Sequence, residues 1–122
     1  MNFKTHLILL LFSLILLGCS NENSESLMDN SPIIGNATYI QNVKKIVDNN
    51  CIVCHATIPL NGAPMSLVTY DQVKNAVLTR GLTSRITLEN GDSSLMPRGG
   101  PKLPQSTIEV ILKWQKDGLL EQ

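Results

Sequence analysis

The chain of 122 residues carries 10 basic and 10 acidic side chains, so its formal net charge at pH 7 is zero. This balance argues against nucleic acid as a partner, because phosphate backbones are bound by strongly basic surfaces. The length corresponds to one domain, and an aromatic content of 4% leaves that domain little bulky apolar material for a core.

Residues 1–18 have the pattern of a signal peptide. A short head with Lys4 precedes an apolar run from Leu7 to Leu17, which is too short for a comfortable membrane span. The run ends in Leu-Leu-Gly-Cys, which resembles the lipobox of bacterial lipoproteins. We therefore expect cleavage before Cys19, a diacylglyceryl group on its thiol, and a protein anchored to a membrane of the cell envelope on the periplasmic or extracytoplasmic side. An ordinary cleavage site followed by a stray cysteine is the alternative.

Residues 19–37 are predicted to form a flexible tether between the lipid and the domain. The segment is rich in Asn, Ser and Glu and has few apolar residues, which is the composition of a solvated chain. A partly ordered arm is the alternative, because Ile33 and Ile34 could dock on the domain. The remaining residues, 38–122, are the predicted domain. Cleavage also removes His6, so His55 is the only histidine of the mature chain.

A first helix is predicted from the residues that follow Thr38. The sequence Thr38-Tyr39-Ile40-Gln41 fits a capping box in which Thr38 is the N-cap and the Gln41 side chain reaches back to it. Asn49-Asn50 loosens the helix just before Cys51. Its apolar face is predicted to consist of Ile40, Val43, Ile46 and Val47.

The sequence Cys51-Ile52-Val53-Cys54-His55 carries the most specific chemistry of the chain. Two thiols at this spacing can each add to a vinyl group of haem, and the histidine that follows them can bind the iron. We predict one covalent haem c held by Cys51, Cys54 and His55. A zinc site and a redox-active dithiol are the alternatives. The zinc site fits less well because zinc commonly takes four ligands, and the dithiol fits less well because a dithiol of the thioredoxin type belongs to a βαβ unit.

The rest of the chain alternates loops and helices. Residues 56–66 are predicted to be a loop, and a capping box of Thr69 and Gln72 opens a helix that ends before Gly81. Residues 84–90 are ambiguous, and residues 91–101 contain too many glycines and prolines for regular structure. No strand pattern of useful length occurs, so we expect an all-α fold. The residues predicted to face inward in the second helix are Val73, Ala76 and Val77.

The last helix is predicted over residues 105–117, just before Gly118. Its apolar stripe is predicted to contain Ile108, Ile111, Leu112 and Gln115, with Trp114 beside it.

The sixth ligand of the iron is predicted to be a methionine. A second histidine is excluded within the mature chain, which leaves methionine, lysine, water or an open position. Met28 lies in the tether and Met65 in the loop after His55. Pro97 favours an extended backbone at Met96, and the neighbouring glycines permit tight turns beside a flat ring. We therefore predict Met96 as the ligand, with Met65 or an open position as the alternatives.

These parts together resemble a small monohaem cytochrome c of the bacterial class I type. The matching features, from about Thr38 to Gly118, are CxxCH after a helix, a Met-Pro loop about forty residues later, and a final helix with a tryptophan. The resemblance implies three to four helices wrapped around a covalently attached haem, with long loops. In the family a proline carbonyl orients the axial histidine, and Pro59 and Pro64 are candidates here. The chain departs from the family where Ala56-Thr57-Ile58-Pro59 replaces a glycine-rich stretch.

The predicted function is electron transfer by a membrane-anchored cytochrome c with His55 and Met96 as axial ligands. No enzymatic activity and no small-molecule substrate are expected. The expected partners are redox proteins, and the protein is expected to be a monomer or a subunit of a larger redox complex. A haem-based sensor or ligand-binding module with a labile sixth ligand is the alternative.

Positive side chains and the tryptophan are candidates for contacts with the two haem propionates. A solvated surface position is the alternative for each of them. The candidates are Arg80, Arg85, Arg98, Lys102 and Trp114. A second set could form a docking patch for a redox partner, although lysines on helix exteriors are usually only solvated. It consists of Lys44, Lys45, Lys113 and Lys116.

Overall fold

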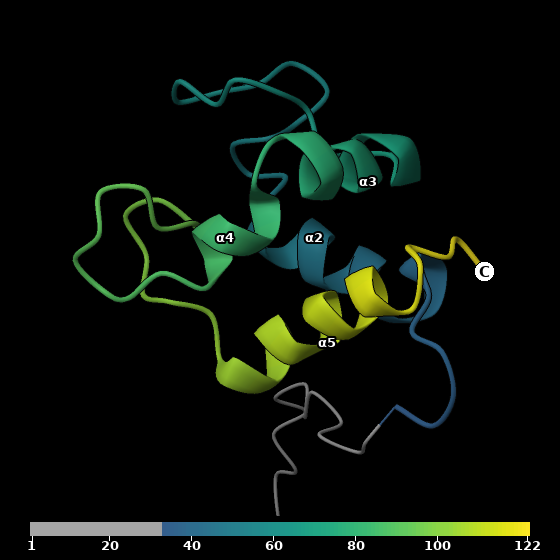
Figure 1. The fold of residues 1–122 in the computed structure, drawn as a ribbon. Helices are drawn as coiled ribbons and strands as arrows, with labels where there is room; N and C mark the ends of the chain where they lie inside the picture. The colour runs from purple at the N-terminus through teal and green to yellow at the C-terminus, as the bar shows by residue number, and fades with distance from the viewer. Residues whose placement is uncertain (1–32) are drawn as a thin grey trace, which may run out of the picture. The chain divides into compact units, whose positions relative to one another are not determined.

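The computed structural model describes residues 33–122, which form helices joined by long loops (Figure 1). None of these residues forms a strand, so the all-α prediction is confirmed. The predicted signal peptide, Cys19, Met28 and most of the tether lie outside the described residues. Within the described part, no helix is both long and apolar enough to cross a membrane. Ile33 packs against the core, whereas Ile34 is 99% exposed.

Five helical elements follow one another along the described chain. They are η2 (Tyr39–Val43), α2 (Lys44–Asn50), α3 (Tyr70–Thr79), α4 (Leu82–Ile86) and α5 (Gln105–Lys116). The predicted first helix is thus a π-helical turn that continues into α2. The ambiguous segment 84–90 contributes only its beginning to α4, and the last helix ends one residue earlier than predicted.

The start of the first helix differs from the predicted capping box. Thr38 Oγ1 accepts the N–H of Gln41 at 3.3 Å, as expected for an N-cap. The N–H of Thr38, however, donates to Asn42 Oδ1 at 2.8 Å and not to Gln41. The π turn holds more residues than an α turn, and this shifts the face that each side chain occupies. As a result Ile40 is 49% exposed, and Tyr39 joins Val43 in the core instead.

The second predicted helix begins with the expected capping box. Thr69 Oγ1 accepts the N–H of Gln72 at 3.3 Å, and Gln72 Oε1 accepts the N–H of Thr69 at 3.1 Å. The same amide oxygen accepts the N–H of Val68 at 2.8 Å, so one side chain fixes the loop that leads into α3. The predicted inward face is confirmed, because Val73, Ala76 and Val77 are all buried.

Helix α5 supplies the centre of the core, although its buried face was partly mispredicted. Leu112 is 37% exposed and Gln115 is also exposed. Trp114 is instead central to the buried face, and its Nε1 donates to the carbonyl of Leu120 at 2.8 Å. Leu112 and Gln115 each lie four residues after a buried position, so helical spacing alone does not separate them from this face. The buried residues of α5 are Thr107, Ile108, Ile111 and Trp114.

The two ends of the described domain are joined by hydrogen bonds. The N–H of Tyr39 donates to the carbonyl of Leu120 at 2.8 Å, and the N–H of Ile40 donates to that of Glu121 at 3.0 Å. The N–H of Ala37 donates to Asp117 Oδ2 at 2.7 Å, and Ala37 is fully buried. The packed domain therefore begins no later than Ala37, one residue before the predicted boundary.

Asp117 should make the stability of the domain pH-dependent. The hydrogen bond from Lys113, followed by that from the N–H of Ala37, lowers the pKa of the Asp117 carboxyl. A lowered folded-state pKa means that the carboxylate stabilises the fold above its unfolded pKa, about 3.9, and that this contribution is lost as the pH falls through the folded pKa. We expect Asp117→Asn to lower the urea midpoint at pH 7. We also expect the midpoint of this variant to fall less between pH 7 and pH 3 than that of the unaltered protein.

The matched control for this prediction is Glu109→Gln on the same helix. Glu109 is exposed, and its side chain accepts a hydrogen bond from the side chain of Gln105 one turn earlier in the helix. Its urea midpoint should differ little from that of the unaltered protein at either pH. Equal midpoints for the two variants at pH 7 would contradict the role given to Asp117.

Candidate functional site

The sequence Cys51-His55 forms a compact turn that continues from the end of α2. The N–H of Cys51 donates to the carbonyl of Val47 at 2.8 Å, and the N–H of His55 donates to the carbonyl of Cys51 at 2.9 Å. Because α2 is packed through Ile46 and Val47, its end gives the turn a fixed base. Both thiols are free in the structure and partly exposed.

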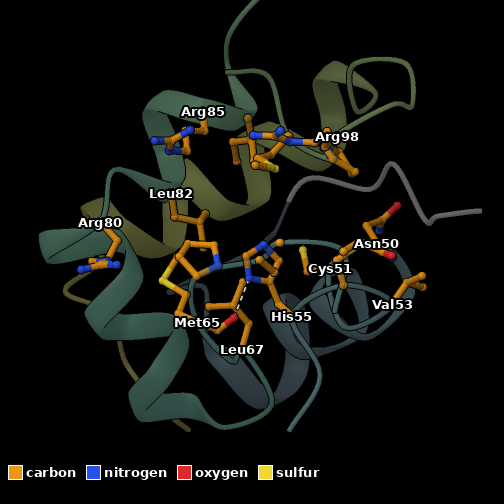
Figure 2. A pocket seen from close by; sticks show the side chains of 18 of the residues that line it. Asn50, Cys51, Val53, His55, Met65, Leu67, Arg80, Leu82, Arg85 and Arg98 are labelled. Carbon is orange, nitrogen blue, oxygen red and sulfur yellow. Dashed lines mark hydrogen bonds between the residues drawn. The ribbon is translucent and has the colours of Figure 1, made fainter. Parts of the chain in front are cut away.

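The imidazole of His55 is held by the backbone of the next loop. His55 Nδ1 lies 2.8 Å from the carbonyl oxygen of Met65, and the carbonyl of His55 accepts the N–H of Leu67 at 2.8 Å (Figure 2). A carbonyl is only an acceptor, so Nδ1 must be the donor. The other ring nitrogen, Nε2, is then unprotonated in the neutral ring and available to a metal. The orienting carbonyl belongs to Met65, and not to Pro59 or Pro64.

A cavity of about 890 Å³ lies beside this histidine. Such a volume is in the upper part of the range of about 300–1,000 Å³ that is usual for sites of cofactors and small molecules. The predicted attachment residues Cys51, Cys54 and His55 line it together with Met65 and Met96. The fold thus gathers residues that are far apart in the sequence, including all the predicted haem ligands, around one space.

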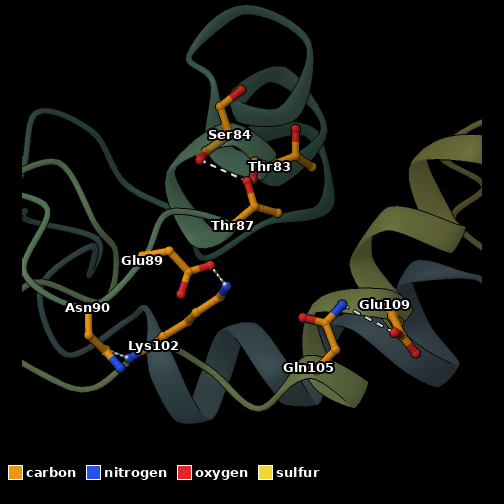
Figure 3. A network of polar contacts seen from close by, with 8 residues as sticks. All are labelled: Thr83, Ser84, Thr87, Glu89, Asn90, Lys102, Gln105 and Glu109. Atoms are coloured by element: carbon orange, nitrogen blue, oxygen red, sulfur yellow. Dashed lines mark hydrogen bonds and ion pairs between the residues drawn. The ribbon is translucent and has the colours of Figure 1, made fainter.

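The loop that carries Met96 is held at Met96 itself and at its base. The N–H of Met96 donates to the carbonyl of Arg85 at 3.2 Å, which ties the loop to α4. At its base, Asn90 Oδ1 accepts the backbone N–H of Lys102 at 2.7 Å, and Glu89 Oε1 lies 2.6 Å from Lys102 Nζ (Figure 3). These contacts hold the thioether of Met96 at the cavity without any regular structure in the loop.

The two methionines of the cavity have different relations to His55. The backbone of Met65 is bonded to Nδ1, so it lies on the side of the imidazole that faces away from Nε2. Met96 comes from a separate loop that is held by α4. The side chain of Met65 packs against the core, and that of Met96 does so too.

Three positively charged side chains line the cavity. Arg80, Arg85 and Arg98 are among its lining residues, and no aspartate or glutamate of the described residues lines it. Arg80 and Arg85 lie on the opposite side of the cavity from Val53 (Figure 2).

Two of the five predicted contacts for propionates are placed elsewhere. Lys102 is paired with Glu89 in the base of the Met96 loop, and the indole N–H of Trp114 is bonded to Leu120 within the core. Neither of these side chains lines the cavity. Trp114 was a poor candidate because a buried aromatic side chain at the centre of a small core is needed there for packing.

Burial changes the acidity of one thiol. Desolvation raises the pKa of the Cys51 thiol to about 11, so this thiol is protonated at pH 7. The Sγ of Cys54 accepts a hydrogen bond from Asn61 Nδ2 at 3.6 Å. In the described residues, no group of three or more His, Cys, Asp or Glu side chains could hold a metal ion.

Sequence reasoning missed the Met65 carbonyl and the two ties of the Met96 loop. A backbone acceptor carries no side-chain signal, Asn90 is a residue type too common on surfaces to be selected in advance, and Lys102 was predicted to make a different contact. Neither the scan of family models nor the searches of curated proteins and of solved structures found a match for this chain.

Proposed function

We propose that the protein is a lipid-anchored monohaem cytochrome c that transfers single electrons, with a cytochrome c-like arrangement of helices around the haem. The observation that carries the proposal is the meeting of Cys51, Cys54, His55 and Met96 at one cavity. The lipid anchor rests on the sequence around Cys19 alone.

The residues of the cavity fit a covalently bound haem. Two cysteines are available for thioether bonds, an oriented imidazole is available for the iron, and apolar residues such as Leu67, Leu82 and Ile86 offer contacts to a porphyrin. The three arginines offer donors for two carboxylates without a competing acidic residue among the described lining residues. The volume of the cavity and its mixture of apolar and cationic walls both support this ligand.

The axial ligands in this proposal are His55 and Met96. The Met65 carbonyl fixes His55 so that Nε2 can bind iron, which also puts the backbone of Met65 on the histidine side. A separate, anchored loop brings Met96 to the same cavity, and this supports Met96 over Met65 for the opposite face of the haem. Haem iron with two such ligands exchanges one electron with little change in coordination and offers no open position to a substrate.

The alternatives of zinc and a redox dithiol are less well supported. A catalytic dithiol depends on a thiol whose pKa is lowered, and Cys51 does not fit that role because burial raises the pKa of its thiol to about 11. The cavity also has a volume far beyond what a single zinc ion or a disulfide exchange requires. A sensor function would need a sixth ligand that leaves readily, and the ties at Arg85 and Asn90 work against that mobility.

Two spectra of the holoprotein test this function. The pyridine haemochrome spectrum reports whether both vinyl groups are saturated, and we expect the spectrum of a haem with two thioether bonds. Exposure of the ferrous protein to carbon monoxide at neutral pH should leave its spectrum unchanged. Ready binding of carbon monoxide would instead support the sensor function, and a protein without haem would refute both.

The arginines at the cavity should raise the reduction potential of the bound haem. Removing one positive charge near the iron favours the oxidised state, so Arg85→Gln should lower the potential. The expected fall is on the order of tens of millivolts, as for a unit charge at roughly 10 Å with an effective dielectric constant of about 20. Potentiometric titration measures it. Lys116→Gln, on the exposed side of α5, is the control of equal charge and should change the potential much less.

A further inference from the structure

We propose that Asn61 is a site at which this chain modifies itself, by slow conversion of the Asn61 amide to a carboxylate. The dipeptide Asn-Gly occurs twice in the sequence, at Asn61-Gly62 and at Asn90-Gly91. Glycine has no side chain to shield its backbone nitrogen and adopts many backbone conformations. An asparagine before glycine therefore loses its amide more readily than one before a larger residue. The structure distinguishes the two dipeptides and selects the first.

The reaction needs only water from outside the chain. The backbone nitrogen of Gly62 attacks Cγ of Asn61, so that a new C–N bond closes a five-membered imide. The proton of the Gly62 N–H leaves together with the side-chain amide group, as ammonia. Water then opens the imide at one of its two carbonyls and leaves either aspartate or isoaspartate. No atom is oxidised or reduced, and both products carry one negative charge at pH 7.

The first dipeptide is the exposed tip of a tight turn. The N–H of Ala63 donates to the carbonyl of Leu60 at 2.9 Å, and φ is 53° at Asn61 and 77° at Gly62. Positive φ at both central residues is the geometry of a type I′ turn, for which Asn-Gly is a favoured pair. Among the described residues, the Asn61 side chain makes one weak contact, from Nδ2 to Cys54 Sγ at 3.6 Å. The turn can therefore rotate into the geometry of attack without disturbing the core.

The second dipeptide is held in place. Asn90 Oδ1 accepts the backbone N–H of Lys102 at 2.7 Å, and the Lys102 ammonium pairs with Glu89 at 2.6 Å (Figure 3). Attack on Cγ of Asn90 requires the first of these bonds to break, because Oδ1 turns with Cγ. One hydrogen bond corresponds to roughly five- to tenfold in an equilibrium constant, so Asn61 should react faster than Asn90 by about that factor.

The modification changes the charge of the cavity. Asn61 and Gly62 both line it, and none of its described lining residues is an aspartate or a glutamate. The new carboxylate is thus the first acidic group of this wall. A negative charge beside haem favours the ferric state, because ferric iron carries one more positive charge than ferrous iron. The modification should lower the reduction potential, and this consequence, unlike the modification itself, rests on the proposed function.

Ageing of the full-length protein at neutral pH tests the site. Peptide mapping by mass spectrometry follows the conversion of amide to acid at Asn61 and Asn90 in the same sample. Enzymatic methylation of isoaspartate identifies product that has passed through the imide. We expect conversion at Asn61 to be roughly five- to tenfold faster than at Asn90 in the folded protein. In concentrated urea, where the bond to Lys102 is lost, the two rates should approach each other.

An equal or faster conversion at Asn90 in the folded protein would overturn the inference. A ratio of rates that urea leaves unchanged would do the same, because the neighbouring sequence and not the fold would then set it. The variant Asn61→Gln should stay unmodified at this position, since glutamine would have to close a six-membered ring. Conversion of that variant at the original rate would show that the nitrogen of Gly62 is not the nucleophile.

The effect on the haem is measured with Asn61→Asp, which copies the aspartate product. Potentiometric titration of the holoprotein should give this variant a lower reduction potential than the unaltered protein. Asn75→Asp, exposed on α3 and outside the cavity, adds the same charge and should shift the potential less. Equal shifts in the two variants would contradict the effect on the haem. A protein without haem would refute the proposed function, and the ageing experiment would still decide whether Asn61 is modified.

Discussion

Replacing both Cys51 and Cys54 with serine is expected to abolish covalent attachment of haem. Serine hydroxyls do not form the thioethers that two thiols can form with vinyl groups. After denaturing electrophoresis, haem staining of the double variant should fall to background, when the protein is produced together with a haem attachment system. The loss should also lower stability, since a domain of this size without its cofactor is marginal.

Two controls separate attachment from export and lipidation. Cys19→Ser should keep the haem stain and change only association with membranes, because Cys19 is assigned to the lipid. Cys54→Ser alone should leave a single thioether at Cys51, with a haemochrome spectrum that reports one unsaturated vinyl group. A double variant that retains its stain would refute thioether attachment.

Replacing Met96 with alanine is expected to open the sixth coordination position. The ferrous variant should bind carbon monoxide at neutral pH, whereas the unaltered protein should not. Loss of the thioether should also lower the reduction potential by some tenths of a volt, because axial ligands set haem potentials over a range of about 0.8 V. Absorbance under carbon monoxide and a redox titration measure the two effects.

The control for this experiment is Met65→Leu. Met65 is bonded to His55 through its backbone carbonyl, which the substitution preserves, and leucine restores most of the packing of the side chain against the core. We expect this variant to stay closed to carbon monoxide. If it opens and Met96→Ala does not, Met65 is the sixth ligand and our assignment is wrong.

Local sequence patterns predicted the helices well where contacts between neighbouring residues are enough to fix the helix start. The Thr69–Gln72 capping box is a contact between neighbours in the sequence, and it formed as expected. The prediction was wrong at Gln41, where a π turn replaces the α-helical start, and at Leu112 and Gln115, which are exposed on the regular α-helix α5. The π turn at Tyr39 and the packing of Trp114 against the C-terminal tail decided those positions.

The candidate site also contains some residues that the sequence indicated and others that only the structure identified. Cys51, Cys54 and His55 lie in one short stretch, so the amino-acid sequence alone indicated them. Because His55 is the only histidine of the predicted mature chain, the sequence also indicated a methionine as the sixth ligand. The sequence could not choose between Pro59 and Pro64, and the structure gives the orienting role to the carbonyl of Met65. Backbone acceptors have no residue signature, and their positions depend on the path of the whole loop.

The sequence by itself predicted the all-α class and the approximate helix positions and indicated haem chemistry at Cys51–His55, because these inferences depend on spacings within a few residues. Only the tertiary structure decided which distant groups share the cavity. It brought Met96 and the three arginines to the same cavity as Cys51, Cys54 and His55, and it assigned Lys102 and Trp114 to other contacts. Such outcomes depend on how α2, α4 and the long loops pack, and no local pattern encodes that packing.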